Sequence, residues 1–209
     1  MKYNEFRSLF AKYPFFRSNS FDMKVDNPKL LRNQLIEWVK KGYVIELKRG
    51  VYTLNPRDRE VGLTELSLAS ILYSPSYISL EYALSFYQLI PERAVGITSI
   101  STKKTQSFEN KLGYFTYRHV QKKCFQGFVQ KEDEFKNSYF IASPEKALVD
   151  YLYFYLRGLS QSLEPKWFEE SLRLQNVETL DIKRIRYFTD FFQQKKLMSV
   201  IKLFEEYYA

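Results

Sequence analysis

Two cations at a predicted turn offer the clearest chemistry in this sequence. Lys48 and Arg49 precede Gly50, between two short β-prone runs at residues 43–47 and 51–54. Glycine adopts the backbone conformations of tight turns at low cost, so the pattern predicts a hairpin with a basic tip. Such a tip can bind the phosphates of a nucleic acid.

The segment before this hairpin has the pattern of a helix with a basic outer face. Asp26 and Asn27 are candidate caps, Pro28 suits the first helical position, and Gly42 suits the residue after the helix. A helix over about residues 28–41 would turn one apolar face to the core, formed by Leu31, Leu35, Trp38 and Val39.

A helix followed at once by a basic hairpin predicts a winged helix-turn-helix, with the helix in the major groove and the hairpin on phosphates. Arg and Asn can read guanine and adenine edges there. The alternative is a solvated helix face without a ligand. The expected DNA-binding residues are Lys29, Arg32, Asn33, Lys40, Lys48, Arg49, Arg17 and Lys24.

A second polar group lies at the start of a later helix. Ser143 and Pro144 form a strong helix start, followed by Glu145, Lys146 and Asp150. This group is either a polar site on one helix face or a capped helix with a Lys–Asp pair at i, i+4. Such a pair contributes only a few tenths of a kcal/mol. We favour the capped helix.

The residue inventory argues against an enzyme. His119 is the only histidine and has no evident triad partner, which argues against a Ser-His-Asp site. A single histidine also excludes any site that needs two imidazole ligands. Cys124 is the only cysteine, and neighbouring lysines are the only sign that it is reactive. Glu109 and Lys111 match a short fragment of metal-dependent nucleases, a remote alternative. We predict no catalytic residue, no metal and no cofactor.

Charge is distributed unevenly along the 209 residues. Residues 1–61 carry 13 Lys and Arg against 7 Asp and Glu, whereas residues 62–209 carry 19 against 17. The asymmetry indicates a polyanionic partner for the first third of the chain. No stretch approaches the roughly 18 apolar residues of a membrane span, and no secretion signal is evident, so we expect a cytoplasmic protein without membrane contact.

The predicted fold class is α+β. Charged residues around Pro56 indicate a linker between a winged helix-turn-helix domain at 1–56 and a second domain at 62–209, which combines a small sheet with a helical C-terminal part. Residues 15–25 are compatible with a short helix or a strand. Helices are predicted at 64–72, 79–89, 144–157, 165–175, 181–192 and 195–208; extended runs at 95–100, 113–120, 125–129 and 139–141; and a polar connection at 101–110.

Three motifs in this order resemble the AbiE-type antitoxin family of bacterial type IV toxin–antitoxin systems. They are residues 40–54, residues 75–92 and residues 143–150, and the resemblance covers about residues 25–155. The motif residues of the second domain are Ser79, Glu81, Ser143, Glu145, Lys146 and Asp150.

The resemblance implies a repressor that binds an inverted-repeat operator in double-stranded DNA and regulates its own operon. It also implies that the second domain is an antitoxin against a nucleotidyltransferase-like toxin encoded nearby, which it counters without a stable complex. The alternative from another class is a protein-interaction module that neutralises a partner protein. An exposed Tyr/Phe patch within residues 77–160 would favour that alternative.

Overall fold

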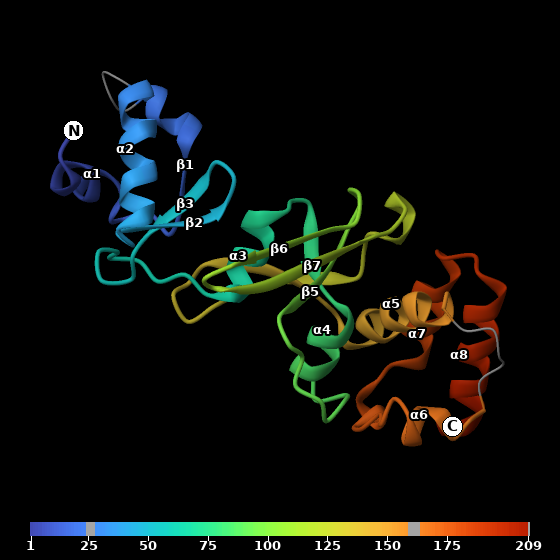
Figure 1. The fold of residues 1–209 in the computed structure, drawn as a ribbon. Coiled ribbons are helices and arrows are strands. Elements are labelled where there is room, and N and C mark those ends of the chain that lie inside the picture. Colours follow the sequence, from blue (N-terminus) through green and yellow to red (C-terminus); the bar gives the residue numbers. More distant parts are fainter. Residues whose placement is uncertain (24–27, 159–163, 209) are drawn as a thin grey trace.

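The computed structural model describes residues 1–23, 28–158 and 164–208, and the fold is α+β. Three parts follow one another along the molecule (Figure 1): an N-terminal unit, a mixed sheet with its covering helices, and a group of C-terminal helices. The described residues form one three-stranded and one six-stranded sheet.

The N-terminal unit alternates short helices and strands. Its elements are α1 (Tyr3–Phe10), β1 (Phe16–Arg17), the 3-10 helix η1 (Ser18–Met23), α2 (Pro28–Lys40), β2 (Val44–Lys48) and β3 (Val51–Leu54). The small sheet has the order β1-β3-β2, with antiparallel pairing throughout. The segment at 15–25 therefore contains both a strand and a helical turn, which the sequence left undecided.

Aromatic packing holds this unit together. Phe6, Phe10, Phe16 and Trp38 are buried and bring α1, β1 and α2 into one core. Gly42 has φ +74°, as predicted for the residue that follows a helix. The Tyr43 N–H donates to the Trp38 carbonyl and the Gly42 N–H to the Val39 carbonyl, so the last carbonyls of α2 are satisfied as the chain turns into β2. The predicted caps Asp26 and Asn27 lie outside the described residues.

The six-stranded sheet is mixed, with the order β6-β7-β5-β4-β9-β8. Parallel pairs join β5 to β7 and β4 to β9, and the other pairs are antiparallel. The strands are β4 (Ser76–Ile78), β5 (Ile97–Ser101), β6 (Gln106–Asn110), β7 (Gly113–His119), β8 (Phe128–Glu132) and β9 (Ser138–Ala142).

Helices cover the two faces of this sheet unequally. On one face, Tyr117 of β7 donates its hydroxyl to the Ala69 carbonyl of α3 (Glu65–Leu72). On the other, Tyr77 of β4 meets α5 (Pro144–Leu156), which packs beside α4 (Leu80–Phe86). Register places Tyr77, Ile100 and Arg118 on the α5 face.

The C-terminal helices pack against α5. They are α6 (Trp167–Glu170), α7 (Ile182–Asp190) and α8 (Lys195–Tyr208), with 3-10 turns η2 (Lys122–Cys124) and η3 (Val177–Thr179) elsewhere in the second half. Figure 1 shows α5 lying between the sheet and α7. Most predicted helices are confirmed, but the one expected at 165–175 is a single turn, and irregular chain follows it.

Two strands were not predicted from the sequence. The polar connection expected at 101–110 contains β6, an edge strand that buries few of its side chains. Its apolar signal is therefore reduced to Phe108. The run Ser76–Ile78 is β4, a fully buried inner strand. Three residues are too few to show a strand periodicity.

The hairpin of the N-terminal unit packs against the second half of the chain. Ile45, Leu47 and Val51 belong to the larger hydrophobic core, not to the core of their own unit. The Asn110 side chain of β6 donates to the Leu47 carbonyl at 3.0 Å. The linker predicted around Pro56 thus connects parts that also touch through β2 and β6.

Two glycines with similar φ angles allow the cost of backbone conformation to be separated from the cost of close packing. Gly42 and Gly96 have φ +74° and +79°, but a Cβ at Gly42 would meet no atom within 4 Å, whereas one at Gly96 would lie 2.4 Å from the Tyr114 carbonyl oxygen. We expect Gly42→Ala to lower the free energy of unfolding by about 1–2 kcal/mol, the cost of a left-handed residue. Gly96→Ala should lower it clearly more, because backbone must also move. Urea denaturation of both variants measures the difference, and equal losses would contradict it.

Candidate nucleic-acid interface and a buried ionic network

The outer face of α2 is a stripe of exposed side chains. Those at the spacing of one helical face are Lys29, Arg32, Asn33, Ile36 and Lys40. The opposite face buries Leu31, Leu35 and Trp38. Lys40 forms an exposed ion pair with Glu37 at 3.0 Å, a type of pair that contributes little to stability. The structure therefore brings the four predicted helix residues together and adds an apolar side chain, Ile36, in their midst.

The hairpin tip separates the two predicted cations. Arg49 is exposed, and Gly50 takes the left-handed conformation with φ +80°. Lys48 turns inward, where its ammonium donates to the Leu72 carbonyl at 2.5 Å and lies 5.6 Å from the centre of the Phe108 ring. Lys48 therefore does not extend into solvent, as the predicted contact with a nucleic-acid phosphate would require. Burial, with Arg17 and Lys103 nearby, lowers the pKa of Lys48.

A basic junction forms where the hairpin meets the second half of the chain. Arg17 and Lys103 both lie close enough to Lys48 to affect its titration. Lys103 donates to the Ser74 carbonyl and lies 5.4 Å from the centre of the Tyr73 ring. Sequence reasoning missed Lys103, because nothing along the chain places residues 101–110 beside the hairpin. The predicted Lys24 lies outside the described residues.

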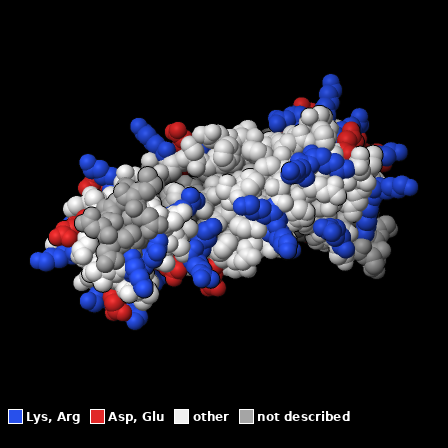
Figure 2. Space-filling view, turned by 90° about the horizontal axis from the view of Figure 1, so that it is seen from above, with Lys and Arg blue, Asp and Glu red and all other residues white. Residues whose placement is uncertain are grey.

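Figure 2 shows one long face of the molecule on which Lys and Arg side chains extend from one end to the other. Acidic side chains are sparse over the middle of this face. The positive surface thus extends beyond the N-terminal third of the chain, although the excess of basic over acidic residues is concentrated in that third.

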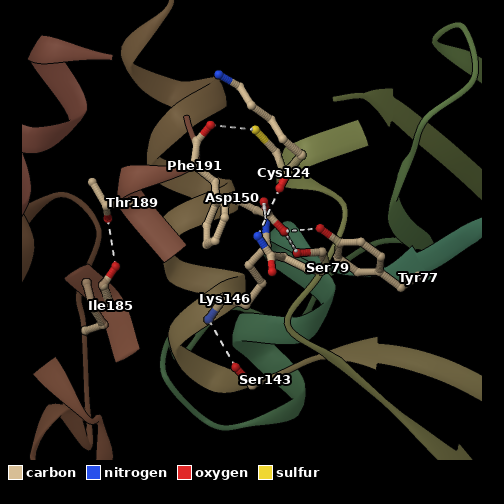
Figure 3. A network of polar contacts seen from close by, with 11 residues as sticks. Tyr77, Ser79, Cys124, Ser143, Lys146, Asp150, Ile185, Thr189 and Phe191 are labelled. Carbon is tan, nitrogen blue, oxygen red and sulfur yellow. Dashed lines mark hydrogen bonds and ion pairs between the residues drawn. The ribbon is translucent and has the colours of Figure 1, made fainter. Parts of the chain in front are cut away.

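The second feature is a carboxylate buried beneath α5 (Figure 3). Asp150 is fully buried and accepts hydrogen bonds from the Tyr77 and Ser79 hydroxyls, each at 2.9 Å to Oδ2. Its Oδ1 pairs with the ammonium of Lys146, which is also buried. Burial raises the pKa of Asp150, while Lys146 and the two hydroxyl groups oppose that change.

Aromatic rings surround the ammonium group of this pair. Lys146 Nζ lies 4.8 Å from the centre of the Phe192 ring and 5.6 Å from that of Tyr77. A Cβ on Gly127 would approach Lys146 Cγ to 3.0 Å, so the chain passes close to the lysine stem. The charged pair is therefore enclosed by side chains from the sheet, α5 and the C-terminal part of the chain.

The start of α5 extends the polar group toward the surface. Ser143 accepts a hydrogen bond from the Lys146 N–H, as a helix cap, and donates its hydroxyl to Glu145 Oε2 at 2.8 Å. Glu145 lies 3.6 Å from Arg184 of α7. The cap is confirmed and the i, i+4 Lys–Asp pair forms, but the pair is buried, so the weak contribution predicted for it does not apply. The spacing is right, yet that helix face is turned into the core.

Ser79 also anchors a strained elbow between β4 and α4. The next residue, Leu80, is buried with φ +59°, a conformation that leucine rarely adopts. The Ser79 N–H donates to the Thr98 carbonyl, and the Thr98 hydroxyl donates to the Ser79 carbonyl at 2.6 Å. These bonds hold the elbow in place. Glu81 follows on the exposed side, apart from the five other predicted motif residues.

The remaining candidates do not assemble into a reactive centre. His119 is exposed, and its Nδ1 lies 3.0 Å from the Lys103 carbonyl. Cys124 is buried, its thiol donates to the Phe191 carbonyl, and burial raises its pKa. Glu109 and Lys111 are exposed. Within the described residues, no group of His, Cys, Asp and Glu could hold a metal ion, as the remote nuclease alternative would need.

The protein-interaction alternative required an exposed aromatic patch within residues 77–160. Among the described residues of that range, the exposed large apolar side chains come from separate elements and loops: Phe86, Val95, Tyr114, Val129 and Phe135.

Comparison with known proteins adds no identification. No family model matches the chain, and no curated protein matches it significantly.

None of the described helices has both the length and the apolar character to cross a membrane.

The network predicts an uneven response to substitution. Asp150→Asn leaves the Lys146 ammonium buried without a counter-charge, so we expect the free energy of unfolding to fall by about 3–5 kcal/mol. The double variant Lys146→Met/Asp150→Leu removes both charges and should recover much of that loss. Lys40→Met, which breaks an exposed pair, should change stability by less than about 1 kcal/mol.

Chemical denaturation of the three variants tests this ordering. If Asp150→Asn is as stable as Lys40→Met, the buried ammonium does not need its counter-charge and the prediction is wrong.

Proposed function

We propose that residues 1–56 form a winged helix-turn-helix that binds double-stranded DNA. The main support for this proposal is the arrangement of α2 and the small sheet. The helix has an exposed basic stripe and leads directly into the β2–β3 hairpin, and β1 completes the sheet in the order β1-β3-β2. A helix of this kind fits the major groove while the hairpin follows the backbone.

The side chains divide into two proposed roles. Arg32 and Asn33 on α2 read base edges, and Ile36, about one helical turn further along the same face, suits the methyl group of thymine. Arg49 at the hairpin tip binds phosphate, and Arg17 adds charge at the junction. Lys48 supports the hairpin through the Leu72 carbonyl instead of contacting DNA directly.

We propose further that the chain is a sequence-specific transcriptional repressor of its own operon, with an inverted-repeat operator. The basic excess of the first third and the resemblance to the AbiE-type antitoxin family support this proposal. The second domain then provides antitoxin activity against a nucleotidyltransferase-like toxin encoded nearby. The motif residues that converge beneath α5 contribute the stability of that domain.

Two substitutions should affect DNA binding differently. Arg49→Ala removes a phosphate contact, so we expect weaker binding to every sequence and a salt dependence reduced by about one unit of slope. Arg32→Ala removes a base contact, so we expect a cost of about 1–3 kcal/mol at the operator and relaxed specificity at one base pair. Fluorescence anisotropy at several salt concentrations measures both, with the DNA upstream of the gene and a scrambled duplex as targets.

Lys183→Ala, on the exposed surface of α7, is the matched control and should bind as the unaltered chain does. Equal, weak binding of the unaltered chain to both duplexes would contradict the repressor. Operator binding that survives both arginine substitutions would contradict the assignment of this face.

The antitoxin proposal has a separate test in living cells. Expression of the neighbouring toxin gene alone should stop growth, and coexpression of this full chain should restore it. The DNA-binding variant Arg49→Ala should restore growth equally well when expressed from an unrelated promoter, because repression is then irrelevant. Growth arrest that persists in the presence of the unaltered chain would contradict antitoxin activity.

A further inference from the structure

A cleft opens on the α5 face of the six-stranded sheet, because α4 and α5 leave part of that face uncovered. Two adjoining hollows of about 560 and 600 Å³ share the lining residues Leu80, Glu81, Arg118 and Tyr151. Volumes of this size suit small-molecule ligands. The floor is β7, one wall is α5, and the strained elbow at Leu80 lies between them.

The floor of the cleft is polar because of the alternation along β7. Phe115 and Tyr117 point to the α3 side and are buried, which places Thr116 and Arg118 on the cleft side. Arg118 is exposed, and its guanidinium takes part in no hydrogen bond, ion pair or ring contact with the described residues. Such a guanidinium, at the floor of a cleft, is well placed for an anionic ligand.

One further arginine and an imidazole line the same hollow. Arg157 follows the end of α5 and lies over the Tyr153 ring, and His119 is the residue after Arg118. The imidazole is held by the Lys103 carbonyl, which ties it to the basic loop that lies beside the hairpin. Glu81 is the single acidic residue in this first hollow.

The wall of the cleft is aromatic. Tyr151 and Tyr155, one helical turn apart on α5, stack with ring centres 5.8 Å apart and an interplanar angle of 19°. Trp167 holds Tyr155 in place, because its indole N–H donates to the Tyr155 hydroxyl at 3.2 Å and the centres of the two rings lie 4.8 Å apart. Rigid aromatic faces beside arginines are the surfaces on which nucleobases stack.

We propose that this cleft binds a nucleotide, with its phosphate at Arg118 and Arg157 and its base against Tyr151 and Tyr155. Glu81 accepts hydrogen bonds from the sugar hydroxyls or from an amino group of the base. Its charge also disfavours an acidic peptide, which would match the arginines but not the carboxylate. The nucleotide is either free or an unpaired residue of single-stranded RNA, and both present the same phosphate, sugar and base.

Calorimetric titration of the full chain tests the proposal, with AMP, UMP, inorganic phosphate and a short single-stranded RNA oligomer as probes. We expect nucleotides to bind more tightly than phosphate alone, because the base adds stacking. Arg118→Gln should weaken binding at least about tenfold, the loss expected for a charge-assisted hydrogen bond. Tyr151→Leu should weaken nucleotide binding but leave phosphate binding unchanged.

Two controls separate this cleft from the proposed DNA-binding face. Arg49→Ala should bind the mononucleotides AMP and UMP as tightly as the unaltered chain, and Lys183→Gln on α7 should bind every probe as tightly. Thermal melting of every variant establishes that it is folded. If Arg118→Gln is unfolded, Arg157→Gln replaces it, since this residue is exposed and also lines the hollow.

The outcomes distinguish the two sources of the ligand. AMP that binds as tightly as the oligomer supports a free nucleotide, whereas an oligomer that binds about tenfold or more tightly supports single-stranded RNA. The proposal is overturned if none of the nucleotide probes binds. It is also overturned if folded Arg118→Gln and Tyr151→Leu bind them as the unaltered chain does, or if Arg49→Ala abolishes binding.

Discussion

The fold depends on keeping the Asp150 carboxylate satisfied in the absence of water. An isolated charge in the core is costly, so the carboxylate requires the Lys146 ammonium and the hydroxyl groups of Tyr77 and Ser79 at fixed positions. These partners come from β4, the start of α4 and α5, and the Phe192 ring follows α7. One buried acid therefore sets where the central strand, two helices and the C-terminal part of the chain meet.

The same constraint shapes the surface of the second half. Ser79 is held by Asp150 and by Thr98, and the next residue, Leu80, takes a positive φ where the chain passes from β4 into α4. As α4 and α5 lie over the inner strands, the outer part of the sheet on that face keeps polar residues such as Thr116 and Arg118. The proposed nucleotide cleft adjoins the buried network at this elbow, where Leu80 lines the cleft, although none of the polar members of the network does.

The hairpin joins the two halves of the molecule. Leu47 and Val51 lie in the larger core, and Lys48 contacts the Leu72 carbonyl, so the tip is fixed relative to the second half. Lys103 approaches the same place from the loop before β6. The proposed DNA-binding face and the proposed nucleotide cleft are therefore connected by packed and positively charged residues.

The sequence by itself determined the elements whose signals are local. The cap at Ser143, the left-handed Gly42, the amphipathic α2 and the alternation along β7 all follow from neighbouring residues, and the structure agrees with them. The local sequence signals were too weak to predict β4 and β6. Strand β4 has only three residues, and β6 has a single apolar residue, Phe108. Only the tertiary structure decided that the Lys146–Asp150 pair is buried, that Lys48 turns inward, and that Arg118 and Tyr151 line the same hollow. The physical reason is that burial depends on which distant segments cover a residue, and spacing along the chain does not contain that information.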